Sequence, residues 1–263
     1  MISMELLVFL ICLAASTIGG VCGIGGGVII KPVLDAIGVM SVSAISFLSG
    51  LTVLSMSAIS VFKQRKAGLV ELRTGSLLAI GAIIGGILGN ALFQAVKATA
   101  GNDSFVGMVQ ALVLAAVTLL TLLYSAFLRK RLPSYRIQNS VACGMIGVIM
   151  GVLSAFLGIG GGPINLAVLY FAFSMDTKKA ASNSLYIILC SQTSSFLTSC
   201  LRGTIPVFLW RYLVFMVAAG VLGGMLGSKL NQKLTSSATD KMFSGLLCLI
   251  ILICLYNAQR FAG

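Results

Sequence analysis

The sequence is dominated by long apolar stretches. Eight of them approach the roughly 20 residues that a helix needs to cross the hydrocarbon core of a bilayer. They cover 6–21, 44–62, 74–96, 105–127, 141–157, 180–201, 208–230 and 242–256. Two further apolar stretches, 28–38 and 163–174, are too short to span comfortably, and each follows a cluster of glycines. The pattern predicts an all-α, polytopic membrane protein with about eight long transmembrane helices and two short broken or re-entrant helices.

Charge and composition exclude the soluble classes of protein. Only 9% of the residues are charged, against about 25% in a soluble chain, so the side chains cannot cover a water-exposed globule. The net charge is +12, but the basic residues lie in short clusters between apolar stretches. Membrane topology explains such clusters better than nucleic-acid binding does. We therefore expect a multi-pass protein of the cell membrane, in a bacterium the inner membrane, that does not bind nucleic acid.

Enzyme chemistry has few of the residues it would need. The sequence contains no histidine, which removes the commonest metal ligand and general base. It also has no pair of intramembrane aspartates and no serine with an obvious base beside it. The sequence thus predicts no catalytic residues, no metal site, no cofactor and no enzymatic activity.

The chain repeats itself. The run Gly-Ile-Gly-Gly-Gly at 23–27 returns at 158–162, an offset of 135, and the turn glycine Gly68 returns at Gly203 with the same offset. Matching features in the same order predict two homologous halves, 1–130 and 137–263. A basic loop at 129–133 joins the halves, and together they would form one transmembrane transport domain.

The distribution of Lys and Arg favours inverted repeats. If each glycine cluster only interrupts one crossing, the two sides of the membrane carry 11 and 6 basic residues with Lys31 set aside. If each cluster is instead the tip of a hairpin, the sides carry 13 and 4. Because basic loops gather on the cytoplasmic side, the more asymmetric arrangement is favoured. It predicts an odd number of crossings in each half, inverted repeats, and both termini outside.

The two glycine clusters are the main candidates for a binding site. Irregular backbone at membrane depth is tolerated only inside protein or beside a polar cavity, and consecutive glycine N–H groups can form a nest for an anion. A short helix follows each cluster and presents its positive N-terminal end. We therefore expect an anion site at mid-membrane formed by Gly25, Gly26, Gly27, Gly160, Gly161 and Gly162. The alternative is that these glycines only allow close helix packing, which is our prediction for the regularly spaced Gly81, Gly85, Gly89, Gly223 and Gly227.

Uncharged polar residues in the neighbouring helices are the next candidates for substrate binding. They are Ser46, Ser49, Asn165, Ser182, Asn183, Ser184 and Gln192. A lone serine in a membrane helix often bonds back to its own backbone. A buried amide needs several partners, so Asn183 and Gln192 could either line the site or bridge helices.

Lys31 and Asp35 are the charged residues of the first short stretch. They are four residues apart and so share one helical face. Their counterparts 135 residues later are Leu166 and Tyr170, so the pair breaks the repeat. Lys31 could hold an anion, with Asp35 as its neutralising partner or a proton acceptor for coupling. Alternatively, the Lys31 ammonium could snorkel to the membrane interface.

The chain resembles the TauE/SafE family of anion permeases, also called sulfite exporters. The residues that carry the resemblance are the first cluster with Pro32 and Ala44, and the second cluster with Lys179-Ala180 and Ser184. The match departs from the family pattern at Pro163 and Ala167, where the second proline is displaced, and at Phe47-Leu48, where the family often has Thr-Ser. The resemblance extends over the whole chain and implies transport of sulfite, a sulfonate or a related small organic anion.

Residues and resemblance together predict a secondary transporter or permease for a small anion. Sulfite or an organosulfonate is the substrate class that the resemblance implies, and export by alternating access around the paired glycine clusters is the expected mechanism. The alternatives are a permease for a small carboxylate and a membrane assembly or interaction subunit that transports nothing. The expected partners are the small anionic substrate and the lipid bilayer, and a homo-oligomer stays open.

Overall fold

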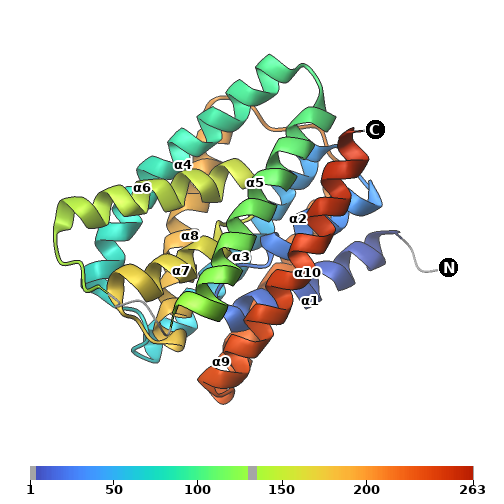
Figure 1. The fold of residues 1–263 in the computed structure, drawn as a ribbon. Coiled ribbons are helices and arrows are strands. Elements are labelled where there is room, and N and C mark those ends of the chain that lie inside the picture. Colours follow the sequence, from blue (N-terminus) through green and yellow to red (C-terminus); the bar gives the residue numbers. More distant parts are fainter. Residues whose placement is uncertain (1–3, 130–134, 263) are drawn as a thin grey trace.

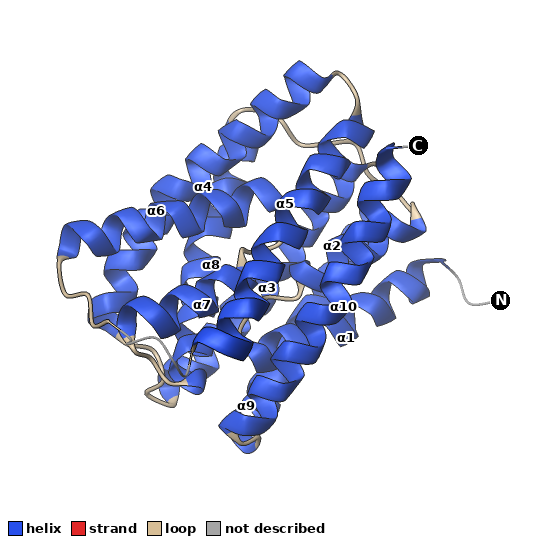
Figure 2. Cartoon of the chain, in the orientation of Figure 1, coloured by secondary structure: helices blue, strands red, loops and turns tan. Residues whose placement is uncertain are grey.

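The computed structural model describes residues 4–129 and 135–262, and over these residues the chain is helical and has no β-strand (Figures 1 and 2). The first half contains α1 (Met4–Cys22), α2 (Gly27–Ile37), α3 (Val42–Lys66), α4 (Leu72–Ala100) and α5 (Asp103–Leu123), which ends in the π-helical turn η1 (Tyr124–Leu128). The second half contains α6 (Ser140–Leu157), α7 (Gly162–Phe173), α8 (Thr177–Leu201), α9 (Trp210–Lys233) and α10 (Ser236–Ala262).

Eight of these helices are long and apolar enough to cross a membrane, and they coincide with the eight predicted stretches. The other two, α2 with 11 residues and α7 with 12, follow the glycine clusters as predicted. At about 1.5 Å of rise per residue, such a helix covers roughly half of the hydrocarbon core, which is about 30 Å thick. The prediction of a polytopic all-α fold is confirmed.

Corresponding helices of the two halves begin and end in the same way. Ser41 caps α3 by accepting a hydrogen bond from Ala44 N–H at 3.3 Å, and Asp176, 135 residues later, caps α8 by accepting from Lys179 N–H at 2.9 Å. Side-chain acceptors at this position satisfy backbone donors that have no partner inside the helix. Left-handed glycines then follow the ends of both helices.

Regularly spaced glycines bring helices of different halves into contact. A methyl group at Gly85 of α4 would overlap the carbonyl oxygen of Val148 in α6, and one at Gly227 of α9 would lie 2.6 Å from the carbonyl oxygen of Thr17 in α1. Such close backbone approach is what small residues permit between membrane helices. The prediction that these glycines serve packing is confirmed.

The packing also defines the direction of each helix. Along α4, Gly81 lies against Gly144 of α6 and Gly89 lies against Ala155, so α4 and α6 are parallel. The same argument makes α1 parallel to α9, α9 parallel to α3, and α4 parallel to α8. Only α3 and α8 oppose each other, because Phe47 packs on Phe196 while Gly50 lies against Gln192.

These directions make α1 antiparallel to its counterpart α6, so the two halves are inverted repeats. Both described ends of the chain lie at the same end of the bundle (Figure 1). The loops at 67–71, 135–139, 174–176 and 234–235 lie at the other end, which we call the basic end because Arg129, Arg136, Lys178, Lys179 and most other basic residues are there. Lys130 and Arg131, which belong to the predicted basic loop, are outside the described residues.

The helices group across the boundary between the halves. One group consists of α1, α3 and α9, a second of α4, α6 and α8, and a third of the pair α5 and α10. Each group therefore contains helices from both halves. The first two groups meet along the antiparallel pair α3 and α8, and the short helices α2 and α7 lie beside that junction.

Candidate functional site

The two glycine clusters form loops that interrupt the bundle at mid-depth. The first glycine loop, residues 23–26, joins α1 to α2, and the second glycine loop, residues 158–161, joins α6 to α7. The equivalent residues Gly25 and Gly160 have φ angles of 77° and 86°. Glycine is needed at both positions, because other residues adopt this left-handed conformation only with strain.

The two loops cross in direct contact. A methyl group at Gly27 would lie 2.7 Å from the carbonyl oxygen of Ile159, and one at Gly162 would overlap the carbonyl oxygen of Ile24. The two contacts are equivalent under the repeat, since both pairs of residues are 135 apart. We call this place the glycine crossing. The expectation that the clusters face each other across a pseudo-twofold axis agrees with this contact.

The short helices lead away from the crossing in opposite directions. The chain leaves α2 at Gly38, which lies against Arg260 at the end opposite the basic end. It leaves α7 at Ser174, whose hydroxyl donates to the Tyr135 carbonyl at the basic end. The positive N-terminal end of α7 therefore faces the opposite end, and that of α2 faces the basic end.

Ser49 places an unpartnered hydroxyl beside the second glycine loop. Its neighbours on the same face of α3 touch that loop, with Ser46 against Gly158 and Val53 against Gly160. Ser49 is fully buried, and its Oγ has no hydrogen-bond partner among the described residues. A buried polar atom without a partner costs about 1–3 kcal/mol, so this hydroxyl is available to a ligand or water.

Ser184 repeats this arrangement at the first glycine loop. On α8, Ala181 lies against Gly23 and Ile188 lies against Gly25, one turn to either side of Ser184. Ser184 is also fully buried, with no partner for its Oγ in the described chain. Because Ser49 and Ser184 are 135 residues apart, each half offers one free hydroxyl to the loop of the other half.

Asn165 and Ser16 add further polar atoms near the crossing. Asn165 lies in the first turn of α7, is fully buried, and has no described partner for either atom of its amide group. Ser16 of α1 lies against Gly26, and its Oγ is also buried and unpartnered. The backbone around the crossing is thus surrounded by side chains with unused hydrogen-bonding capacity.

Two apolar side chains close the crossing itself. Val53 and Ile188, which are equivalent under the repeat, both lie against Gly160 and Gly25. All residues of the two loops are buried. Access to the glycine amides therefore requires that these side chains move or that a cavity approaches from one side.

A polar cavity approaches from the end opposite the basic end. It has a volume of about 50 Å³, lies between α3, α4 and α8, and reaches Gly158 of the second glycine loop. Its polar lining consists mainly of Ser43, Ser46, Asn90, Gln192, Ser195 and Ser199. Lys97 at its mouth is the charged residue among the described residues that line it. The N-terminal end of α7 faces this cavity, which we call the outer cavity.

The three other polar residues predicted for the site differ in how they are bonded. Gln192 donates to the Ser154 carbonyl and hydroxyl, both at 3.1 Å, and also lines the outer cavity. Asn183 accepts from Glu71 N–H at 3.1 Å and donates to the Lys179 carbonyl at 2.8 Å. Ser182 bonds back to the carbonyl of Lys178. Gln192 is therefore at the site, whereas Asn183 bridges α8 to the loop before α4.

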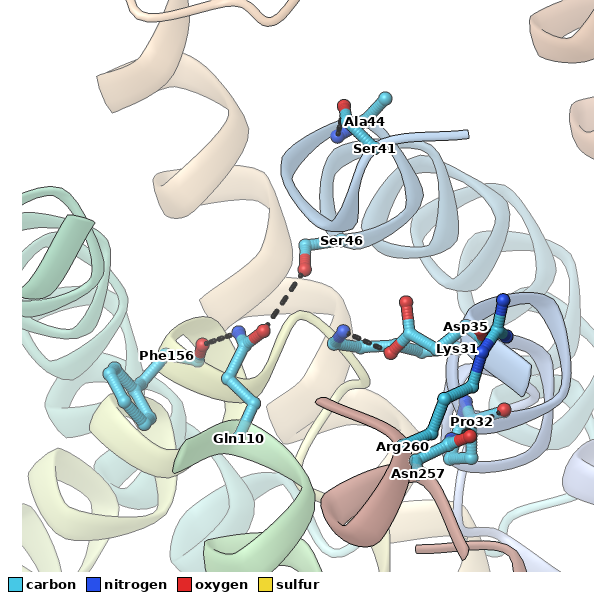
Figure 3. Close-up of polar contacts among 10 residues, drawn as sticks. All are labelled: Lys31, Pro32, Asp35, Ser41, Ala44, Ser46, Gln110, Phe156, Asn257 and Arg260. Carbon is cyan, nitrogen blue, oxygen red and sulfur yellow. Dashed lines mark hydrogen bonds and ion pairs between the residues drawn. The ribbon is translucent and has the colours of Figure 1, made fainter. Parts of the chain in front are cut away.

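Lys31 and Asp35 form a buried ion pair on α2. The distance from Lys31 Nζ to Asp35 Oδ2 is 2.6 Å, and both side chains are at most 5% exposed. Arg260 and Asn257 of α10 hold the same helix by donating to the carbonyls of Asp35 and Pro32, as Figure 3 shows. Because the Lys31 side chain is 3% exposed, its ammonium does not snorkel to the interface.

A short chain of contacts connects Lys31 to the outer cavity. Lys31 and Gln110 of α5 line the same cavity of about 10 Å³. Gln110 accepts a hydrogen bond from Ser46 at 3.4 Å and donates to the Phe156 carbonyl at 2.7 Å (Figure 3). Since Ser46 lines the outer cavity, the positive charge of Lys31 lies one side chain behind the wall of that cavity.

Several residues of this region were not among the sequence candidates. Asn90 of α4 donates to Ser199 at 2.8 Å and to Ser195 at 3.4 Å, and all three line the outer cavity. Asn90 and Gln110 are single amides in apolar spans, a signal that marks functional positions in membranes and that could have identified them. Among the described residues, no group of three or more Cys, Asp or Glu is arranged to hold a metal ion.

A comparison with protein families gave one match. The model of the family described as Sulfite exporter TauE/SafE matches residues 8–253, which is nearly the whole chain. Neither the comparison with curated proteins nor the comparison with solved structures gave a match.

Proposed function

This chain belongs to the sulfite exporter TauE/SafE family of membrane transporters, and we propose that it exports a small oxyanion, either sulfite or an organosulfonate, by alternating access. The observation that carries the proposal is the set of unpartnered polar atoms around the glycine crossing, at the inner end of a polar cavity. We place the anion between the second glycine loop, Ser46, Ser49 and Gln192.

The electrostatics of this place suit an anion. The N-terminal end of α7 carries a partial positive charge, and serine hydroxyls and the Gln192 amide can donate hydrogen bonds to oxyanion oxygens. Lys31 adds a full positive charge behind Ser46 that Asp35 neutralises while no substrate is bound. Asp35 is the residue we propose for proton coupling, if the transport cycle has any.

Outward movement of the substrate needs no carboxylate relay. An anion is driven out of a negative interior by about 2.3 kcal/mol per charge for each 100 mV of membrane potential. The bodies that rock are the two mixed groups of helices, α1, α3 and α9 against α4, α6 and α8. The tight glycine contacts lie inside these groups, whereas the outer cavity lies at the junction between them.

The test is a flux measurement with purified protein in liposomes. We expect sulfite or an organosulfonate to cross faster than sulfate and small carboxylates, and the rate to increase when the potential is made more favourable to the anion. Saturable flux of carboxylates alone would reassign the substrate class. If no anion of the panel crosses at either of two potentials, the protein is an assembly or interaction subunit and the proposal is wrong.

A further inference from the structure

We propose that a second anion vestibule lies at the basic end of the molecule, around Ser60, Gln64 and Ser228, and that it is closed in this structure. This inference rests on the proposed function. It identifies the side chains that take the anion from the basic side before it reaches the glycine crossing.

The three residues form a buried polar cluster between α3 and α9. Ser60 and Ser228 both donate to the carbonyl oxygen of Gly224, at 3.3 Å and 2.7 Å, so their hydroxyls lie close together. Gln64 lies one turn beyond Ser60 on the same face of α3. It is fully buried, and neither its amide nitrogen nor its amide oxygen has a partner among the described residues.

An amide with no partner is costly unless another state of the protein uses it. A buried and unsatisfied polar group costs about 1–3 kcal/mol, and Gln64 has two such atoms. No packing role requires an amide there, since a leucine or methionine would fill the same volume without this cost. An anion or water in an open state would supply the missing partners.

The repeat relates this cluster to the outer cavity. Ser60 and Gln64 correspond to Ser195 and Ser199 with the offset of 135, and Ser228 of α9 corresponds to Asn90 of α4 with an offset of 138. In the outer cavity, Asn90 bonds to both of these serines.

Packing contacts support the two offsets. Gly86 of α4 lies against Ser191 of α8, and the equivalent Gly224 of α9 lies against Met56 of α3. The cluster around Gln64 is therefore the inverted counterpart of a set of residues that lines a cavity at the other end.

An apolar gate separates the Gln64 cluster from the glycine crossing. It consists of five buried residues at the junction of α3 and α8, namely Val53, Met56, Val61, Leu185 and Ile188. Buried apolar side chains in contact exclude water, and hydrophobic constrictions of this kind close membrane pathways. The basic end is thus shut where the opposite end is open.

Two departures from the repeat explain this difference. Leu185 in the gate corresponds to Gly50 at the outer cavity, and Met56 corresponds to Ser191. Gly50 leaves the room that Gln192 occupies, because a methyl group there would lie 2.9 Å from the Gln192 amide oxygen. Large side chains on one side and small ones on the other make the resting structure asymmetric.

The mouth of the second vestibule is also closed by a contact. Lys178 at the start of α8 donates to the carbonyl oxygen of Gln232 in α9 at 3.3 Å. The counterparts of these residues, Ser43 and Gln94, line the open outer cavity. The positive N-terminal end of α2 faces this vestibule, as that of α7 faces the outer cavity, so the second vestibule suits the same class of small anion.

Cysteine labelling in detergent tests this inference, because both ends are then in contact with the reagent. The seven native cysteines are replaced, and Gln64→Cys or Ser199→Cys is introduced and treated with a charged methanethiosulfonate. We expect Ser199→Cys to react at least about tenfold faster than Gln64→Cys, and Leu185→Ala to raise the rate at Gln64→Cys at least about tenfold by opening the gate. Ser60→Cys repeats the test if Gln64→Cys does not fold, and the exposed Ser237→Cys is the matched control whose rate Leu185→Ala leaves unchanged.

Two results would overturn the inference. One is that Gln64→Cys and Ser60→Cys stay unreactive with and without Leu185→Ala while Ser199→Cys reacts. The other is that Gln64→Cys reacts as fast as Ser199→Cys with the gate intact. If flux in liposomes is normal in either case, only the second vestibule is lost. If the labelling is as expected but no anion crosses, the proposed function fails and the anion assignment fails with it.

Discussion

The first and second glycine loops can be compared residue by residue, because the repeat aligns them at a constant offset. Their backbones agree, since Gly25 and Gly160 share a left-handed conformation and the contacts at Gly27 and Gly162 are reciprocal. Their surroundings differ. The first loop leads into a helix with the Lys31–Asp35 pair, and the second leads into a helix with the unpartnered Asn165 and borders the outer cavity.

The comparison separates two roles. The shared backbone provides the crossing and the two opposed helix ends, which any small anion could use from either side. The differing side chains set which side is open and where the full positive charge lies. We therefore expect changes in the shared backbone to stop transport, and changes in the side chains to alter affinity or accessibility.

The largest effect is expected at the crossing. Gly162→Ala drives a methyl group into the Ile24 carbonyl, and a misplacement of about 1 Å at such a site can reduce the rate by about a hundredfold. Flux in liposomes should fall to background, and Gly27→Ala should do the same. Gly245→Ala is the matched control, because a methyl group there meets nothing within 4 Å. Normal flux in Gly162→Ala protein that keeps its fold would contradict the shared role of the two loops.

The charged pair of α2 gives the next largest effect. Lys31→Ala alone leaves Asp35 as a buried, unpaired charge, which is strongly destabilising, so the test uses Lys31→Met together with Asp35→Asn. A hydrogen-bonded charge contributes about 1.5–3 kcal/mol, so the KM for the anion should increase about tenfold or more while the thermal stability stays near that of the native protein. An unaltered KM would assign the pair to holding α2 in place.

The two free hydroxyls compare the two loops most directly. Ser49→Ala removes a donor beside the open outer cavity, and Ser184→Ala removes the equivalent donor beside the closed side. Neither should lower stability, because both hydroxyls lack partners. A neutral hydrogen bond contributes about 0.5–1.5 kcal/mol. Binding of anion to the resting protein should therefore weaken about threefold to tenfold in Ser49→Ala and little in Ser184→Ala, as titration calorimetry would measure. Equal effects would mean that the resting state is not asymmetric.

The smallest effect on transport is expected at Asn183. This residue bridges α8 to Glu71 and Lys179, so Asn183→Ala should lower the free energy of unfolding by about 1–2 kcal/mol. The KM for the anion should not change. A higher KM with unchanged thermal stability would return Asn183 to the binding site.

Most of the fold could be predicted from the sequence, because membrane-spanning length and the offset of 135 are properties of the residues alone. The basic residues predicted inverted repeats, and the helix directions agree. The exchange of helices between halves was not foreseen. It depends on which glycine stripe meets which partner, and the stripes at Gly85 and Gly227 carry no mark of their partner.

The site was less predictable for a similar reason. Glycine clusters, Lys31 with Asp35, and Gln192 stand out in an apolar sequence. Asn90 and Gln64 gain their meaning only from the register of α3, α4, α8 and α9. Asn183 has the same chemistry as Gln192 but lies at the end of α8 that meets a loop, so its amide is used by backbone groups there.

The central claim is that an anion binds where the second glycine loop meets the outer cavity. Selenite is a close analogue of sulfite, and its selenium gives an anomalous scattering signal in crystals of the protein. The account predicts an anomalous peak beside Gly158, within hydrogen-bonding reach of Ser46, Ser49 or Gln192, and no such peak in Gly162→Ala crystals. A peak found only among the surface lysines, or none at a selenite concentration that saturates transport, would contradict it.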